Sequence, residues 1–68
     1  MGTIIQTFGE YMADVISYFA KISGTPAERA ISYGRRQADF IRTGFDKGHS
    51  VRTTAQVLDV MYYGNKRQ

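Results

Sequence analysis

Six apolar residues in the first third of the chain are spaced alternately three and four positions apart: Ile5, Phe8, Met12, Val15, Phe19 and Ile22. That period places them along one side of an α-helix that packs against other helices. A strand fits poorly, because apolar residues also stand next to each other, as at Tyr18-Phe19. We therefore expect an amphipathic helix over residues 3–23.

A helix stop and a helix start follow at once. Gly24 is a typical residue just beyond a helix C-terminus. In Thr25-Pro26-Ala27-Glu28, the threonine can accept a hydrogen bond from the amide of Glu28, and proline needs no donor in the first turn. This signature predicts a second helix over residues 26–43, extending at most to residue 47, in an antiparallel hairpin with the first. Three small residues on its inward side would let the first helix approach closely: Ala30, Gly34 and Ala38.

A glycine-containing turn at residues 44–48 precedes Ser50, which is well placed to cap a third helix. We expect that helix over residues 51–63, ended by a glycine, with residues 65–68 as a frayed basic tail. The chain is therefore expected to be all-α. Residues 1–68 would form a single small domain, a helical hairpin plus a third helix.

Residues that carry chemistry are scarce in this sequence. The 68-residue chain has no cysteine and a single histidine, so the usual nitrogen and sulfur ligands of a zinc site are missing. His49 is adjacent to Ser50, but neighbours in a turn rarely aim at one another, and no third group would orient the base. We expect no catalytic residue, no metal, no cofactor and no small-molecule substrate.

Chains of this size have small cores and often depend on disulfides, metals or partner subunits. Because the first two are missing here, we expect a protein–protein interaction or assembly module. It would self-associate or dock a protein partner through the amphipathic first helix. The candidate interface residues are the apolar positions of that helix and the tyrosines beside them, since tyrosine is favoured at interfaces. They are Ile5, Phe8, Tyr11, Met12, Val15, Tyr18, Phe19 and Ile22.

An alternative of a different class rests on arginine. The net charge is +3, and the excess of basic residues falls after residue 24. Four arginines are spaced to lie on one side of the second helix: Arg29, Arg35, Arg36 and Arg42. Guanidinium groups match phosphate oxygens, so these residues are candidates for phosphate or nucleic-acid contacts. A charge this modest also suits an ordinary solvated helix face, and both interpretations stay open.

Two further alternatives are weaker. The polar side of the first helix has Lys21 against Glu10 and Asp14, which argues against binding to an anionic membrane surface. Residues 50–60 are spaced like the start of a helix-turn-helix, but the segment after them is too short for a recognition helix. Without a run of about 18 apolar residues or an N-terminal leader pattern, we expect a cytoplasmic location, or one within a virion or other assembly.

Overall fold

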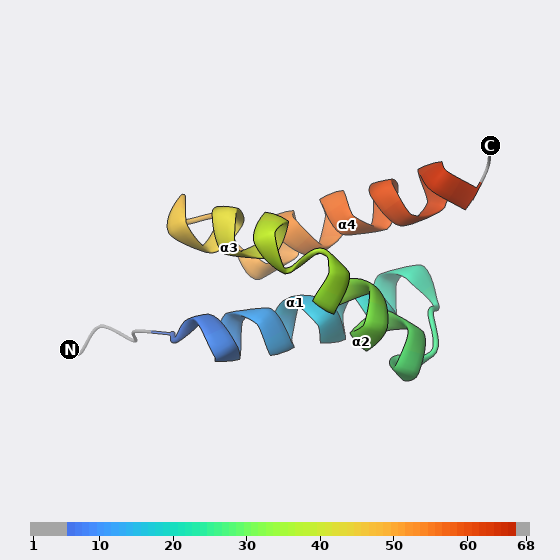
Figure 1. Cartoon of the computed structure of the whole chain (residues 1–68), viewed down its shortest axis with the longest axis horizontal. Helices are drawn as coiled ribbons and strands as arrows, with labels where there is room; N and C mark the ends of the chain where they lie inside the picture. The colour runs from blue at the N-terminus through green and yellow to red at the C-terminus, as the bar shows by residue number, and fades with distance from the viewer. Residues whose placement is uncertain (1–5, 67–68) are drawn as a thin grey trace.

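The computed structural model describes residues 6–66 and confirms the all-α fold, with four helices in place of the three expected. The helices are α1 (Phe8–Ser23), α2 (Ala27–Arg36), α3 (Ala38–Asp46) and α4 (Val51–Lys66). Helix α1 contacts each of the other three and is the centre of the fold. Figure 1 shows α2 crossing the second half of α1, α3 leading back toward the end where α1 begins, and α4 running in the same left-to-right direction as α1.

Helix α1 begins later than its apolar pattern predicts, at a capping box. Thr7 Oγ1 accepts a hydrogen bond from the Glu10 amide at 3.2 Å, and Glu10 Oε1 accepts one from the Thr7 amide at 3.0 Å. These two reciprocal bonds satisfy donors that the first helical turn would otherwise leave unpaired. The start at Phe8 corrects the expected start at residue 3. Residues 1–5, with the candidate interface residue Ile5, lie outside the described part of the chain.

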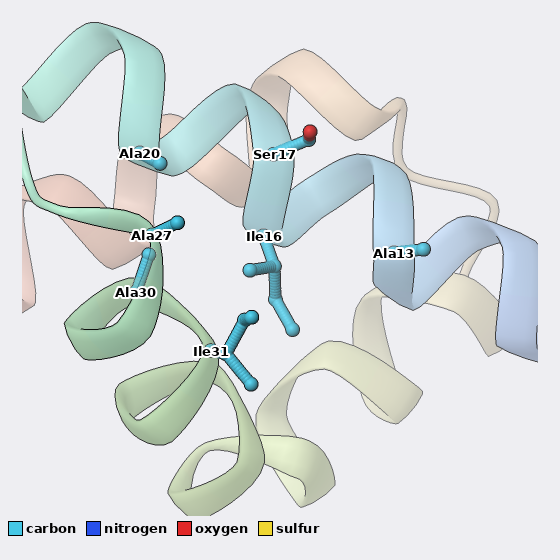
Figure 2. Close-up of a pocket in the computed structure, with 7 residues that line it drawn as sticks. All are labelled: Ala13, Ile16, Ser17, Ala20, Ala27, Ala30 and Ile31. Carbon is cyan, nitrogen blue, oxygen red and sulfur yellow. The ribbon is translucent and has the colours of Figure 1, made fainter.

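The α1–α2 hairpin forms as the glycine signal indicates. Gly24 has a φ of 68°, a left-handed conformation that glycine adopts without strain, and its amide donates to the Ala20 carbonyl. The cap of α2 differs from the expectation, because Pro26 occupies the cap position and no side chain caps the helix. Thr25 Oγ1 instead lies 2.6 Å from Ser23 Oγ, within the turn itself. Figure 2 shows the two helices diverging from this turn, with Ala20 beside Ala27.

The expected second helix is two helices, separated at Gln37. The Gln37 amide donates to both Tyr33 O at 3.0 Å and Gly34 O at 3.1 Å, while the Ile41 amide donates to Gln37 O at 3.0 Å. With φ at −101° and ψ at 23°, Gln37 has a non-helical backbone that ends α2 and starts α3. Neither glycine nor proline occupies this position, and Gly34 one turn earlier is the nearest residue that weakens a helix, so the local sequence does not place the break at Gln37. The change of direction leaves Ile41 fully buried in the core.

Helix α4 is capped as expected but is longer than expected. Ser50 Oγ accepts a hydrogen bond from the Thr53 amide at 3.1 Å, which confirms Ser50 as the cap. The helix then continues through Gly64 to Lys66, beyond the expected end at residue 63. An exposed glycine inside a helix costs about 1 kcal/mol relative to alanine, which weakens a helix without ending it. Residues 67–68 of the expected tail lie outside the described residues.

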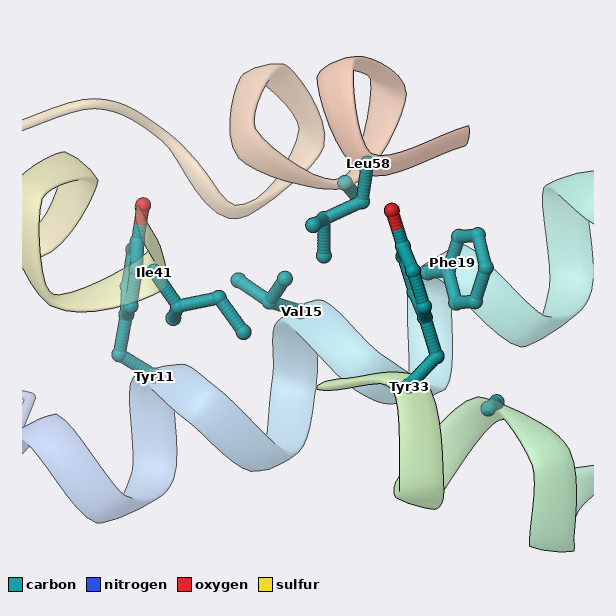
Figure 3. Close-up of a cluster of buried hydrophobic side chains, with 8 residues drawn as sticks. Tyr11, Val15, Phe19, Tyr33, Ile41 and Leu58 are labelled. Carbon is teal, nitrogen blue, oxygen red and sulfur yellow. The ribbon is translucent and has the colours of Figure 1, made fainter. Parts of the chain in front are cut away.

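All four helices supply the hydrophobic core, part of which is shown in Figure 3. Its buried members are Tyr11, Val15, Phe19, Ala30, Tyr33, Ile41, Ala55 and Leu58. Aromatic rings join α1, α2 and α4 at one end, where Phe19 lies 5.6 Å from Tyr33 and 5.5 Å from Tyr62 between ring centroids. The Phe19 and Tyr62 rings meet edge to face, and such aromatic pairs add about 0.5–1.5 kcal/mol to the burial of their area.

Candidate binding surfaces

The predicted interface of the first helix is largely occupied by the protein's own core. Tyr11, Val15 and Phe19 are only 3%, 0% and 0% exposed, so in this fold they present no surface to a partner. This corrects the expectation for those three residues. Their spacing is typical of any helix that packs against helices, whether those belong to the same chain or to another one.

The remaining predicted interface residues on α1 differ in exposure. Phe8, Met12 and Tyr18 are partly buried and pack against the core. Ile22, near the end of the helix, is 39% exposed. These four residues do not form a continuous apolar surface, because buried core residues lie between them.

Tyr11, expected at the edge of an interface, is instead part of a buried hydrogen-bonded group. Its hydroxyl lies 2.6 Å from Thr54 Oγ1 and donates to the His49 carbonyl at 2.9 Å. The tyrosine thus joins α1 to α4 and to the turn before α4. The Ser50 hydroxyl donates to Thr53 Oγ1 at 3.0 Å, and His49 is exposed in the turn before α4.

An accessible apolar groove of about 340 Å³ lies between α1 and α2. Its lining residues, drawn in Figure 2, are Ala13, Ile16, Ser17, Ala20, Ala27, Ala30 and Ile31. The alanines leave the groove hollow, and Ile31 stands at its side with 47% of its surface exposed. We call this feature the α1–α2 groove. The sequence does not indicate this groove, because the groove side of α1 contains small residues rather than a regular apolar stripe.

Exposed charges of both signs lie beside the α1–α2 groove, in hollows that each share a lining residue with it. Asp14 and Lys21 share with Ser17 a hollow between α1 and Val51 at the start of α4. Glu28 and Arg35 share with Ile31 the hollow on the outer side of α2. Because the hairpin turn joins residues 23 and 27, Lys21 and Glu28 lie toward the closed end of the groove. Asp14 and Arg35 lie farther from this closed end.

The four predicted phosphate-contacting arginines do not form one surface. Arg42 lies on α3, where it forms an ion pair with Asp46 at 3.2 Å and covers the Phe8 ring at 5.0 Å from its centroid. Arg35 and Arg36 share the hollow on the outer side of α2. Arg29 and Arg36 also share a cleft with a residue of α4, whereas the break at Gln37 places Arg42 on a separate helix.

Arg29 and Arg36 line a cleft of about 220 Å³ where α2 meets α4. We call it the α2–α4 cleft, and its lining residues are Arg29, Ser32, Tyr33, Arg36 and Tyr62. The Tyr33 and Tyr62 rings meet edge to face, with centroids 4.9 Å apart. The sequence does not predict Tyr62 as part of a phosphate site, since only the tertiary fold brings it to Arg29 and Arg36.

The hydroxyl of Tyr33 is buried and has no hydrogen-bond partner among the described residues. Its burial raises the pKa of this tyrosine from the ordinary value of 10.0, the positive charge of Arg36 lowers it, and Tyr62 raises it further. Leaving a buried hydroxyl unpaired costs about 1–3 kcal/mol, so such a group in a native fold needs an explanation.

No cluster of three or more histidine, cysteine, aspartate or glutamate residues occurs within residues 6–66. In the same part of the chain, no helix combines the length and the apolar character that crossing a bilayer requires. Comparisons of the chain with protein-family models, curated proteins and solved structures found no match. The α1–α2 groove and the α2–α4 cleft are therefore the candidate binding sites that we consider for a function.

Proposed function

We propose that this protein is a non-enzymatic assembly module that pairs with a second copy of itself through the α1–α2 groove. The observation that supports this most is the position of Ile31, a large apolar side chain 47% exposed beside an empty apolar hollow. A second copy would bury this side chain. Burying the exposed half of an isoleucine contributes about 1 kcal/mol, and a two-fold pair does so twice.

The small lining of the groove favours a helix as its occupant. Ala13 and Ala20 are two turns apart on α1, and Ala27 of α2 lies beside Ala20 (Figure 2). Alanines at a helix contact let two helix axes approach to about 8 Å, the short end of the usual range. The first helix would therefore still carry the interaction, as the sequence predicts, but through its small-residue side.

The charges at the border of the groove favour a second copy of this chain as the partner. In a two-fold pair with α1 of one copy over α2 of the other, Asp14 faces Arg35 and Lys21 faces Glu28. Each exposed charge then meets one of opposite sign. Such pairs add little affinity at the solvent-exposed rim, but they select the orientation of the two copies.

The molar mass in solution tests this proposal. The chain has a mass of 7.7 kDa, so light scattering behind a sizing column should give twice that value at high concentration and fall toward 7.7 kDa on dilution. Ile31→Asp should keep the protein monomeric throughout. Val60→Asp is the matched control, because Val60 is 70% exposed on α4, away from the groove. A monomer at every concentration, or equal dissociation by both substitutions, would contradict the proposal.

A further inference from the structure

We propose that the α2–α4 cleft is a binding site for a phosphate group, held between Arg29 and Arg36. This site is separate from the α1–α2 groove and does not depend on self-association. The proposal rests on two features of the cleft: the spacing of the arginines and their lack of internal partners.

The two arginines are positioned to converge on one ligand. They are seven residues apart on α2, which is about two helical turns or 10 Å along the axis. Ser32 and Tyr33 lie between them on the cleft wall, and Tyr62 closes it from α4. An anion in the cleft would therefore meet guanidinium groups from both ends and hydroxyl-bearing residues from the sides.

The positive charges of the cleft are not neutralised from within the described chain. Arg29 and Arg36 form no ion pair and donate no side-chain hydrogen bond to any residue of the described range 6–66. Arg42, by contrast, is paired with Asp46. Two unpaired guanidinium groups beside one cleft attract an anion, and a doubly charged anion balances both of them.

The two guanidinium groups favour phosphate over a carboxylate. Phosphate has enough acceptor oxygens to take two guanidinium groups at once, whereas a carboxylate has only two oxygens. Tyr33 is among the lining residues, but its hydroxyl is covered by protein and has no partner among the described residues, so it is not a ligand group of the site.

The test is a titration with inorganic phosphate, followed by amide chemical shifts at constant ionic strength. Shifts should concentrate on residues 29–36 and on Tyr62, and chloride at the same ionic strength should not reproduce them. Arg29→Gln and Arg36→Gln should each weaken phosphate binding at least about ten-fold, the usual effect of losing a charged hydrogen-bonding partner. Arg35→Gln, on the same helix but outside the cleft, should change it less than about two-fold. Equal losses in all three variants, or shifts that chloride reproduces, would overturn the proposal.

Replacing Tyr33 by phenylalanine separates a ligand-binding role from a structural one. Because the Tyr33 hydroxyl is covered by protein, the Tyr33→Phe variant should bind phosphate within about two-fold of the wild-type protein, and its melting temperature without phosphate should be unchanged or higher. Loss of phosphate binding at an unchanged melting temperature would show that the hydroxyl rather than the arginine pair holds the anion, and would overturn the proposal.

Two sources of phosphate can be distinguished in the same experiment. A short single-stranded oligonucleotide that displaces inorganic phosphate from the cleft would identify a nucleic-acid backbone as the source. An oligonucleotide that leaves inorganic phosphate bound in the cleft would identify a small phosphomonoester as the source. Both results support a phosphate site, and the absence of any arginine-dependent phosphate binding contradicts it.

Discussion

Ile16 of α1 lies directly over Gly34 of α2, where a side chain would not fit. A β-carbon added to Gly34 would come within 2.6 Å of Ile16 Cδ1, far closer than normal van der Waals contact. The missing side chain lets α1 and α2 approach closely, and Ile16 then forms part of the groove wall. The hairpin and the proposed binding groove thus depend on the same glycine.

Gly34→Ala should therefore destabilise the protein. Alanine is the better helix former by about 1 kcal/mol, but displacing a packed β-branched side chain costs about 1–3 kcal/mol. We expect a net loss of about 1 kcal/mol in the free energy of unfolding, measured by urea denaturation. Gly64→Ala is the control, because nothing lies within 4 Å of a β-carbon at Gly64. It should leave stability unchanged or raise it, and a stabilising Gly34→Ala would contradict the close packing.

Two buried tyrosines should respond oppositely to loss of their hydroxyls. Tyr11→Phe removes the contact with Thr54 and the hydrogen bond to His49, and should lower the free energy of unfolding by about 1–3 kcal/mol. Tyr33→Phe removes a hydroxyl without a partner and should be neutral or stabilising. Thermal unfolding of both variants in phosphate-free buffer checks this. Similar losses in the two variants would indicate that Tyr33 has an internal partner.

The same tyrosine predicts how stability depends on alkaline pH. Burial keeps the pKa of Tyr33 above its ordinary value of 10.0, so the folded state holds this proton after the unfolded chain has lost it. The contribution of Tyr33 to stability is therefore complete below about pH 10 and falls as pH rises through the folded-state pKa. Tyr33→Phe should lose less stability than the wild-type protein between about pH 9 and 11, measured by urea denaturation. Parallel decline of both proteins would contradict the raised pKa.

The fold was predictable where a residue acts locally. Gly24 ends α1 and Ser50 caps α4 because both signals depend on a few neighbouring backbone groups. The Thr7–Glu10 capping box is of the same kind, so the sequence contained enough to place the start of α1 at Phe8. The break at Gln37 was less predictable. Gly34, one turn earlier, weakens a continuous helix, but nothing in the sequence places the break at Gln37.

The candidate sites were less predictable than the fold, for a physical reason. The spacing of Val15 and Phe19 shows that α1 buries one side, but it does not distinguish an internal core from an interface. The spacing of the four arginines predicts a shared side only on one continuous helix, and the break at Gln37 places Arg42 on α3. Tyr62 is far from Arg29 in sequence, so the cleft exists only once α4 has packed beside α2.

The central claim, pairing through the α1–α2 groove, is tested most directly by nuclear Overhauser effects between copies. Isotope-labelled and unlabelled protein would be mixed, and only contacts between the two would be recorded. The account predicts contacts from the Ile31 and Ile16 methyl groups of one copy to Ala13 and Ala20 of the other. Contacts from a different face, or none at a concentration where the molar mass is that of a dimer, would contradict it.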